Sequence, residues 1–238
     1  EKITKTYGTG TSRFIAVSDM SFQVASGEFV GVMGESGAGK STLLSILGAL
    51  NTPTAGRYLV DDIDVYGLPR EKQADFRREF LGFVFQNFHL IPYLSVMENV
   101  MLPLTTSPLA RKAKKDMAAR ALVKVGLPNK ARQVPFEISG GEKERTAVAR
   151  AIVNEPPIIL ADEPTGNLDT RNTGEIMKLL RRLNRNGTTI IMVTHSQECA
   201  GYADRILTMA DGRLVRGDVC QEVSDARQGT VEAVRIAV

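Results

Sequence analysis

The sequence predicts an α/β fold with a mostly parallel β-sheet, and three observations support this prediction. Apolar runs of strand length occur at residues 29–33, 81–85, 158–162 and 188–194, with helical spacing in segments between them. A phosphate-binding motif of the form G-x-x-x-x-G-K-[ST] follows the first run and precedes a helical segment. Each of the other runs ends in or is followed by polar side chains, at the edge where ligands bind in open α/β sheets.

The segment before the phosphate motif predicts a small antiparallel sheet. Residues 3–7 and 15–24 have the pattern of strands, and a Gly-Thr-Gly turn joins them. Tyr7 stands just before this turn, where it is either an edge residue or a ring that stacks on a nucleobase. After the helix that follows the motif, residues 51–56 form a turn and residues 58–61 begin another short strand pair.

The phosphate motif consists of Gly34, Glu35, Ser36, Gly37, Ala38, Gly39, Lys40, Ser41 and Thr42. Its glycines let backbone N–H groups converge on the α- and β-phosphates of a nucleotide, and the following helix adds the positive end of its dipole. We expect Lys40 to reach the β- and γ-phosphates and the Ser41 hydroxyl to be placed for Mg²⁺. The alternative is a glycine turn before an ordinary helix, but the preceding strand and the Lys-Ser-Thr sequence favour a phosphate site.

A lone glutamine ends the next strand. Residues 71–80 are charged and helical in spacing, and residues 81–85 form a buried strand that ends on Gln86. A glutamine after a strand often has no role, but at the carboxyl end of this sheet we expect Gln86 near Mg²⁺ or the attacking water. The following segment, residues 87–100, is unusually apolar and aromatic for a connection. It either packs under its own helices or forms a groove for another protein's helix.

Residues 107–126 predict a helix with Ser107 as N-cap, Pro108 in the first turn and Gly126 as the stop. The apolar stripe of this helix consists of Leu109, Ala113, Met117, Ala121 and Val125. Its other face carries the cations Arg111, Lys112, Lys114, Lys115 and Arg120. This basic face is either solvated or attracted to anionic lipid headgroups.

Ser139, Gly140 and Gly141 open the next apolar helix. Their hydroxyl and uncluttered backbone N–H groups offer a second site for an anion, although Ser-Gly-Gly alone is a common loop. The following buried strand ends in two carboxylates, Asp162 and Glu163, which take different roles because side chains alternate along a strand. We expect Asp162 on the Mg²⁺ shell and Glu163 to polarise the water that attacks the γ-phosphate, rather than two solvated acids.

The last part of the sequence completes the sheet. A polar turn that contains Asp169 follows the two acids, and residues 188–194 form a buried strand that ends on His195. His195 is either a surface residue or donates a hydrogen bond to a phosphate oxygen. Residues 205–209 and 213–215 predict a terminal hairpin, and beyond this hairpin the pattern leaves open a helix or a loose tail.

Length and composition indicate a soluble globular protein, because 238 residues with 43% hydrophobic and 24% charged side chains suffice for one large domain or two small lobes. No stretch approaches the ~20 apolar residues of a membrane span, and no signal-peptide pattern opens the sequence. A net charge of +3 is too small to indicate nucleic acid. Cys199 and Cys220 have no metal-ligand spacing and no disulfide framework, so we expect reduced cysteines and a cytoplasmic location.

In their order along the chain, these residues resemble the ATP-binding subunit of an ATP-binding-cassette (ABC) transporter. The set that carries the resemblance is Tyr7, residues 34–42, Gln86, Ser139, Gly140, Gly141, Asp162, Glu163, Asp169 and His195. The resemblance implies a P-loop NTPase (RecA-like) core with a mostly parallel sheet, an N-terminal antiparallel β subdomain and an inserted α-helical subdomain. One nucleotide-binding domain would span residues 1–238, with the core in residues 1–86 and 154–238 and the helical subdomain in residues 87–153.

The same resemblance implies roles for individual residues. Tyr7 would stack on adenine, Gln86 would couple Mg²⁺ to the membrane partner, and Asp169 would lie at a dimer interface. The catalytic set would be Lys40, Gln86, Glu163 and His195, and the Mg²⁺ ligands would be Ser41, Gln86 and Asp162. Two copies would close head to tail around two ATP molecules, so that Ser139, Gly140 and Gly141 of one copy cap the ATP held by the other.

The partner would be an integral-membrane permease that contacts residues 86–100, and the chain would be peripheral on the cytoplasmic face of the cell membrane. The lipoprotein-release and macrolide-export branch is resembled by residues 83–86, 90–92, 98–100 and 163–169. Cell-division and antimicrobial-peptide-resistance ATPases are similar to this branch. The family's signature normally reads Leu-Ser-Gly-Gly-Gln, whereas Glu142 ends it here. This acid suits a helix N-terminus but brings negative charge towards a γ-phosphate unless Lys143 or Arg145 offsets it. Glu142→Gln is therefore predicted to tighten ATP-driven dimerisation.

Several function classes compete. An ATPase that moves a membrane protein fits every motif, and a nucleotide-gated module that recruits or regulates a membrane partner would use the same residues. ABC ATPases that act on DNA need a long coiled coil, which the segment between the phosphate motif and Asp162 is too short to hold. Those that act on ribosomes need two cassettes in one chain, and a small-molecule kinase would lack the Ser-Gly-Gly element.

Overall fold

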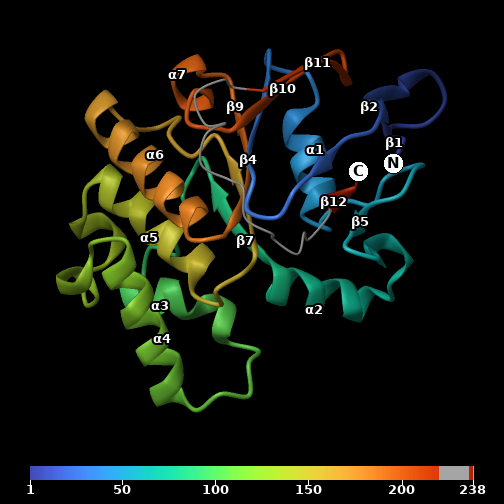
Figure 1. The fold of residues 1–238 in the computed structure, drawn as a ribbon. Coiled ribbons are helices and arrows are strands. Elements are labelled where there is room, and N and C mark those ends of the chain that lie inside the picture. The colour runs from blue at the N-terminus through green and yellow to red at the C-terminus, as the bar shows by residue number, and fades with distance from the viewer. Residues whose placement is uncertain (220–235, 238) are drawn as a thin grey trace.

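The structure is a computed structural model of the chain that describes residues 1–219 and 236–237 (Figure 1). At its centre lies a six-stranded sheet in the order β11-β10-β4-β9-β8-β7, in which all neighbours are parallel except β10 and β11. Its strands are β4 (Phe29–Gly34), β7 (Leu81–Phe85), β8 (Ile158–Asp162), β9 (Thr189–Thr194), β10 (Arg205–Ala210) and β11 (Arg213–Val219). The predicted terminal hairpin is therefore β10 and β11, with β11 four residues longer than expected.

Both faces of this sheet are covered, which explains why its strands are continuous apolar runs. In β8, Ile159 and Ala161 face one core, while Ile158 and Leu160 face the other. The first core lies against the helices of residues 96–152 and 170–185. The second lies against the helix that follows β4. Because the two cores are fixed by alternation along β8 and β9, the register of these central strands is strongly specified.

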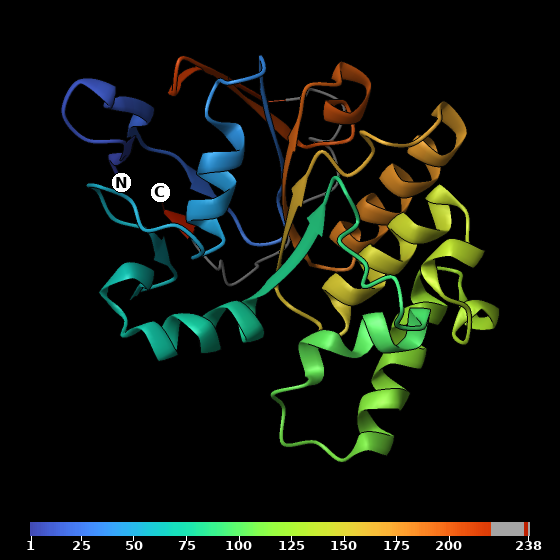
Figure 2. The ribbon, with the colours of Figure 1, turned by 180° about the vertical axis from the view of Figure 1, so that it is seen from behind.

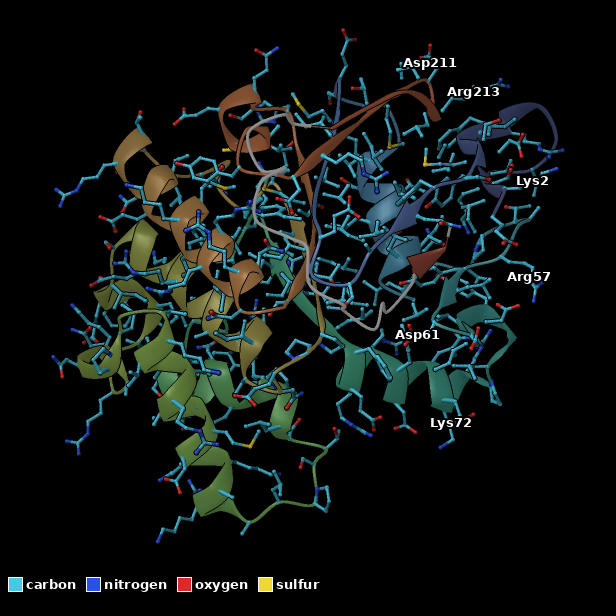
Figure 3. The ribbon with its side chains drawn as sticks, viewed as in Figure 1. Lys2, Arg57, Asp61, Lys72, Asp211 and Arg213 are labelled. Carbon is cyan, nitrogen blue, oxygen red and sulfur yellow. The ribbon has the colours of Figure 1, made fainter. Side chains whose placement is uncertain are left out.

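Two smaller antiparallel sheets lie beside the central one, and the predicted strand pair that begins at residues 58–61 belongs to the second of them. Strand β1 (Ile3–Tyr7) pairs with β2 (Phe14–Met20). The predicted strand over residues 15–24 is interrupted, and its end, β3 (Gln23–Val24), joins a different sheet with β12 (Ile236–Ala237), β5 (Leu59–Val60) and β6 (Ile63–Asp64). Exposed charged side chains surround these strands, among them Lys2, Arg57, Asp61 and Lys72 (Figure 3). The rest of the predicted helix or tail lies outside the described residues.

Helices flank the sheet on both sides, with α1 and α2 on one side and α3 to α6 on the other (Figures 1 and 2). Their bounds are α1 (Lys40–Leu47), α2 (Arg70–Phe80), α3 (Val96–Met101), α4 (Arg111–Lys124), α5 (Gly140–Ile152), α6 (Thr170–Arg185) and α7 (Gln197–Ala200). Sequence periodicity did not identify α3, α6 or α7. None of the helices in the described residues combines the length and apolar composition that a bilayer span requires.

Helix α4 begins later than predicted. Ala110 precedes its first turn, and Ser107 is not the N-cap, since its hydroxyl instead accepts a hydrogen bond from the Leu109 amide at 3.3 Å. This bond stabilises a turn ahead of the helix and leaves Leu109 exposed rather than in the apolar stripe. The predicted stop is correct, because Gly126 has φ +76° and the Leu127 amide donates to the Leu122 carbonyl across it.

Candidate functional site

The phosphate motif forms the connection between β4 and α1. Gly39 has φ +94°, and a Cβ atom there would lie 2.1 Å from the Ala16 carbonyl oxygen. Only glycine fits this position, which is the second fixed glycine of the pattern G-x-x-x-x-G-K-[ST]. Lys40 is 8% exposed, and its Nζ donates to the carbonyl oxygens of Gly34 at 2.7 Å and Glu35 at 2.8 Å. The loop therefore surrounds an ammonium group at the N-terminus of α1, where an anion is favoured.

Asp162 lies at the carboxyl end of β8, opposite the start of α1. The Ser41 hydroxyl donates to Asp162 Oδ1 at 3.4 Å, which joins the two predicted Mg²⁺ ligands. Burial raises the pKa of Asp162, and the neighbouring charge of Glu163 raises it further. The Ser41 hydroxyl and the Lys40 ammonium act in the opposite direction on this pKa. A cation bound beside Asp162 would relieve the unfavourable burial of its carboxylate.

Glu163 and His195 form a pair at the same edge of the sheet. Glu163 Oε2 lies 2.6 Å from His195 Nδ1, and the Glu163 amide donates to the Val193 carbonyl at 2.9 Å. Glu163 has φ +47°, a left-handed conformation that is unusual for a residue other than glycine and often marks a functional site. Since β8 ends at Asp162, Glu163 belongs to the turn after the strand, and both acids line the same cavity. The separate roles of the two carboxylates stay a prediction.

Gln86 follows β7 and contacts the turn after Glu163. A Cβ atom on Gly166 would lie 2.8 Å from Gln86 Nε2, so the Gln86 side chain packs against the backbone of this turn. Asn167 Nδ2 donates to the backbone carbonyl of Gln86 at 2.8 Å and to Asn87 Oδ1 at 3.1 Å. The Asn167 contacts therefore fix the start of the segment after Gln86 to the turn that carries the catalytic candidates.

Tyr7 belongs to an aromatic wall that has a second member. The rings of Tyr7 and Phe14 stack with centroids 5.4 Å apart, and Lys5 Nζ lies 5.1 Å from the Tyr7 centroid. Asn51 donates a hydrogen bond to the Tyr7 hydroxyl. Phe14 was not identified as a site residue. Phe14 can be found as a site residue from the pairing of β1 with β2, because it lies directly opposite Tyr7 and is 59% exposed.

One cavity of about 740 Å³ brings most of the predicted site together. It is lined by Tyr7, Phe14, Ile15, Ala16, Ser36, Gly37, Gly39, Lys40, Ser41, Thr42, Gln86, Asp162, Glu163 and His195. Its volume suits a nucleotide-sized ligand. Among the described residues, the predicted members outside this lining are Gly34, Glu35, Ala38, Ser139, Gly140, Gly141 and Asp169.

The Ser-Gly-Gly element and Asp169 lie together at the starts of two neighbouring helices. Ser139 is the N-cap of α5, in a capping box where its hydroxyl accepts from the Glu142 amide and its own amide donates to Glu142 Oε2. Asp169 is the N-cap of α6 and accepts from the Asn172 amide at 2.8 Å. A Cβ atom on Gly141 would lie 2.2 Å from Asn172 Oδ1, so the two helix starts are in close contact.

Gly141→Ala is expected to lower the free energy of unfolding by about 1–2 kcal/mol, because the added methyl group displaces Asn172 from Asp169. Gly140→Ala is the matched control, since a Cβ atom there meets only Leu168 Cδ2 at 3.8 Å and alanine is the better helix former. Urea denaturation of both variants checks this. Equal stability of the two variants would contradict the close contact.

The charge of Glu142 is offset, but not by the predicted partners. Lys130 Nζ lies 3.1 Å from Glu142 Oε1, whereas Arg145 pairs with Glu175 at 2.7 Å. The ion pairs of the described residues include none between Glu142 and Lys143. The pairing with Lys130 could not be expected from helix spacing, because Lys130 lies in the 3₁₀ helix η4 (Pro128–Lys130), outside α5.

Comparison with known proteins identifies the family. The family profile described as "ABC transporter" matches residues 17–166, which is more than half of the sequence. The chain belongs to the ABC transporter family. As a member it is an ATP-binding ATPase, and the predicted resemblance and fold class are confirmed.

Individual relatives in the ABC transporter family agree with this assignment. The chain is 48% identical over 211 residues to the macrolide export ATP-binding/permease protein MacB of Chlorobium luteolum, covering 89% of this chain and 32% of the relative. It is 44% identical over 220 residues to an uncharacterized ABC transporter ATP-binding protein, YvrO, of Bacillus subtilis, covering 91% and 96%. The chain thus spans about a third of the length of the macrolide-export relative and nearly all of the other.

Solved structures of ABC cassettes superpose on nearly the whole chain. The dimeric post-hydrolysis structure of the ATP-binding cassette MJ0796 bound to ADP and Pi has a TM-score of 0.85 and 39% identity, covering 93% of this chain and 97% of that one. The structure of cbiO1 from Clostridium perfringens, part of the ABC transporter complex cbiONQ, has a TM-score of 0.83 and 30% identity, covering 94% and 88%.

Proposed function

We propose that two copies of this chain hydrolyse ATP at two composite sites and that hydrolysis moves a membrane permease. The observation that carries the proposal is the separation of two anion-binding elements. The phosphate motif and the Glu163–His195 pair surround one cavity, whereas Ser139, Gly140 and Gly141 open α5 outside its lining. A second copy that brings its own α5 to this cavity would complete the site. The dimeric form of the MJ0796 cassette supports such a pairing.

Different residues of the cavity would bind different parts of ATP. Tyr7 and Phe14 offer a stacked aromatic surface for the adenine base. The phosphate motif would bind the triphosphate through backbone N–H groups, with Lys40 moving from the carbonyl oxygens of Gly34 and Glu35 to the β- and γ-phosphates. Ser139 and Gly141 of the second copy would cap the γ-phosphate, and Asp169 would lie at the interface beside them.

The residues at the sheet edge fit a magnesium ion. Mg²⁺ prefers oxygen ligands and takes one or two from protein together with phosphate oxygens and water. Ser41 and Asp162, already joined at 3.4 Å, and the Gln86 amide oxygen supply this set. In the described residues no group of three His, Cys, Asp or Glu side chains is gathered for a metal, which fits an ion held largely by the nucleotide. When bound, Mg²⁺ would neutralise charge on the phosphates.

Glu163 and His195 would perform the chemical step. Glu163, with its side chain 15% exposed, would accept a hydrogen bond from the water that attacks the γ-phosphate and take its proton as the bond forms. In its imidazolium form, in which both ring nitrogens carry a proton, His195 would hold the carboxylate in place from Nδ1 and donate to a γ-phosphate oxygen from its other nitrogen. The short contact between the two side chains therefore orients the base.

We further propose that the permease contacts residues 86–100 and that the chain lies on the cytoplasmic face of the membrane. In the macrolide-export relative, ATP-binding and permease parts carry one name, which supports such a partner. Tyr93 is 81% exposed, which suits a contact surface. Arg150 donates to the carbonyl oxygens of Phe88 and His89 from α5, so a movement of this segment would reach the helix that carries Ser139.

Mixing two inactive variants tests the composite site. Lys40→Ala disables the phosphate motif, here called the cradle, and Ser139→Arg disables the Ser-Gly-Gly element, here called the cap. Each variant alone is therefore expected to lack ATPase activity. A mixed dimer holds one site with an intact cradle and an intact cap, so mixing should restore up to about a quarter of the wild-type rate. The measurement is phosphate release by each variant and by their mixture, with circular dichroism to verify folding. Folded variants that show no recovery on mixing would count against the composite site.

A further inference from the structure

Glu142, the acid directly after the Ser-Gly-Gly element, forms an ion pair that neutralises its charge. Glu142 Oε2 accepts from the Ser139 amide at 2.8 Å, while Glu142 Oε1 lies 3.1 Å from Lys130 Nζ. The side chains of Glu142 and Lys130 are 18% and 35% exposed. Hydrogen bonds from Ser139 and the charge of Lys130 hold the pKa of Glu142 below its ordinary value. Glu142 is therefore a partly buried carboxylate that keeps its charge.

Lys130 is held in position by the backbone around it. The Lys130 amide donates to the Leu127 carbonyl at 3.2 Å, and the Lys130 carbonyl accepts from the Gln133 amide at 3.0 Å. Leu127 is 2% exposed and anchors this turn in the core. The backbone that carries Lys130 is therefore fixed, and forming the pair with Glu142 requires only the ordering of the two side chains.

The same turn is bonded to the start of α3. The Val96 amide donates to the Gln133 carbonyl at 2.8 Å, and the Met97 amide donates to the Ala131 carbonyl at 3.0 Å. Val96 and Met97 belong to the segment proposed to contact the permease. Lys130 thus lies between that segment and the helix that carries Ser139.

We propose that Lys130 is a charge-compensating residue of the composite ATP site, which cancels Glu142 so that the N-terminus of α5 can meet the triphosphate bound by a second copy. This inference rests on the proposed function. Glu142 lies three residues along α5 from Ser139, a rise of about 4.5 Å, well within the ~8 Å screening length at physiological salt. Without Lys130, the first turn of α5 carries an uncompensated negative charge towards the incoming phosphates.

The test is ATP-dependent dimerisation, measured by sedimentation equilibrium in the slowly hydrolysing Glu163→Gln parent. Lys130→Met should weaken the dimer about 10-fold, and adding Glu142→Gln to it should return the affinity to about that of the parent. Lys130→Arg should stay within about twofold of the parent because it keeps the charge. The Lys130→Met defect should shrink as salt rises, which a loss of packing would not do.

Lys124→Met is the matched control, because Lys124 pairs with Glu155 at 2.8 Å on an exposed part of the surface and should leave dimerisation unchanged. Two results with a parent that dimerises would overturn this inference alone. One is a Lys130→Met variant with the same dimer affinity as the parent. The other is a double variant, Lys130→Met with Glu142→Gln, whose dimer affinity stays as low as that of Lys130→Met. A parent that stays monomeric with ATP overturns the proposed function and this inference with it.

Discussion

Glu163→Gln is expected to lower the rate of ATP hydrolysis by about 10²–10⁴-fold while ATP binding is retained. The amide keeps the size of the carboxylate but cannot take a proton from the attacking water. Lys40, Ser41 and the aromatic wall of Tyr7 and Phe14 are unchanged by this substitution, so the nucleotide should bind as before. If two copies close around ATP, the variant should also accumulate as an ATP-bound dimer, because hydrolysis no longer opens it.

Three measurements on purified Glu163→Gln check this expectation: phosphate release, affinity for a fluorescent ATP analogue, and molar mass with ATP and with ADP. Glu198→Gln is a matched control, since Glu198 is an exposed carboxylate in the first turn of α7, outside the cavity lining. Normal phosphate release by Glu163→Gln would mean that another group activates the water. His195→Ala should reduce the rate less, because His195 orients Glu163 and does not take the proton.

The carboxyl edge of the sheet could be predicted because three of its strands are apolar runs that end in or just before a polar side chain. Gln86, Asp162 and His195 follow this rule, and the parallel order of β7, β8 and β9 brings them to one cavity. A strand buried on both faces leaves a polar side chain only where it ends, so the pattern marks the site directly.

Of the features that the sequence analysis missed, one is local and two depend on contacts between separate segments. Helix α6 has a strong N-cap in Asp169, but this residue was interpreted as part of a polar turn because its neighbours are polar as well. Phe14 is a site residue only through its pairing with Tyr7. Lys130 meets Glu142 across a turn and a helix start. For Phe14 and Lys130 the partner is set by the packing of separate segments, which residue spacing within one element does not contain.

Glu144 is a charged residue type that the packing of the protein places in the interior. It lies in α5 with no exposed surface, and within the described residues neither of its carboxylate oxygens has a hydrogen-bond partner. Burial raises the pKa of Glu144 to about 9, against which the charge of Arg150 acts weakly. The folded protein therefore keeps this carboxyl protonated at neutral pH, whereas the unfolded chain ionises it above its ordinary value of 4.5.

The sign of the resulting pH dependence follows from proton binding. Between pH 4.5 and about 9 the folded state holds one more proton at Glu144 than the unfolded state does, so raising the pH favours unfolding. The loss of stability from this group begins near pH 4.5, grows with pH and levels off above about 9. At pH 7 it amounts to roughly 3 kcal/mol, which is a large share of the stability of a domain.

Glu144→Gln is accordingly expected to stabilise the protein, and by more at pH 8 than at pH 5, because the amide does not titrate. The stability gained should approach about 3 kcal/mol in the neutral range and fall towards the small effect of an amide-for-acid exchange near pH 5. Urea denaturation at both pH values measures it. Glu155→Gln is the control of opposite sign: the Lys124 contact holds the pKa of Glu155 below its ordinary value, so this substitution should not stabilise at either pH. Parallel pH curves for wild type and Glu144→Gln would show that the buried carboxyl finds a partner or solvent and that its pKa is not raised.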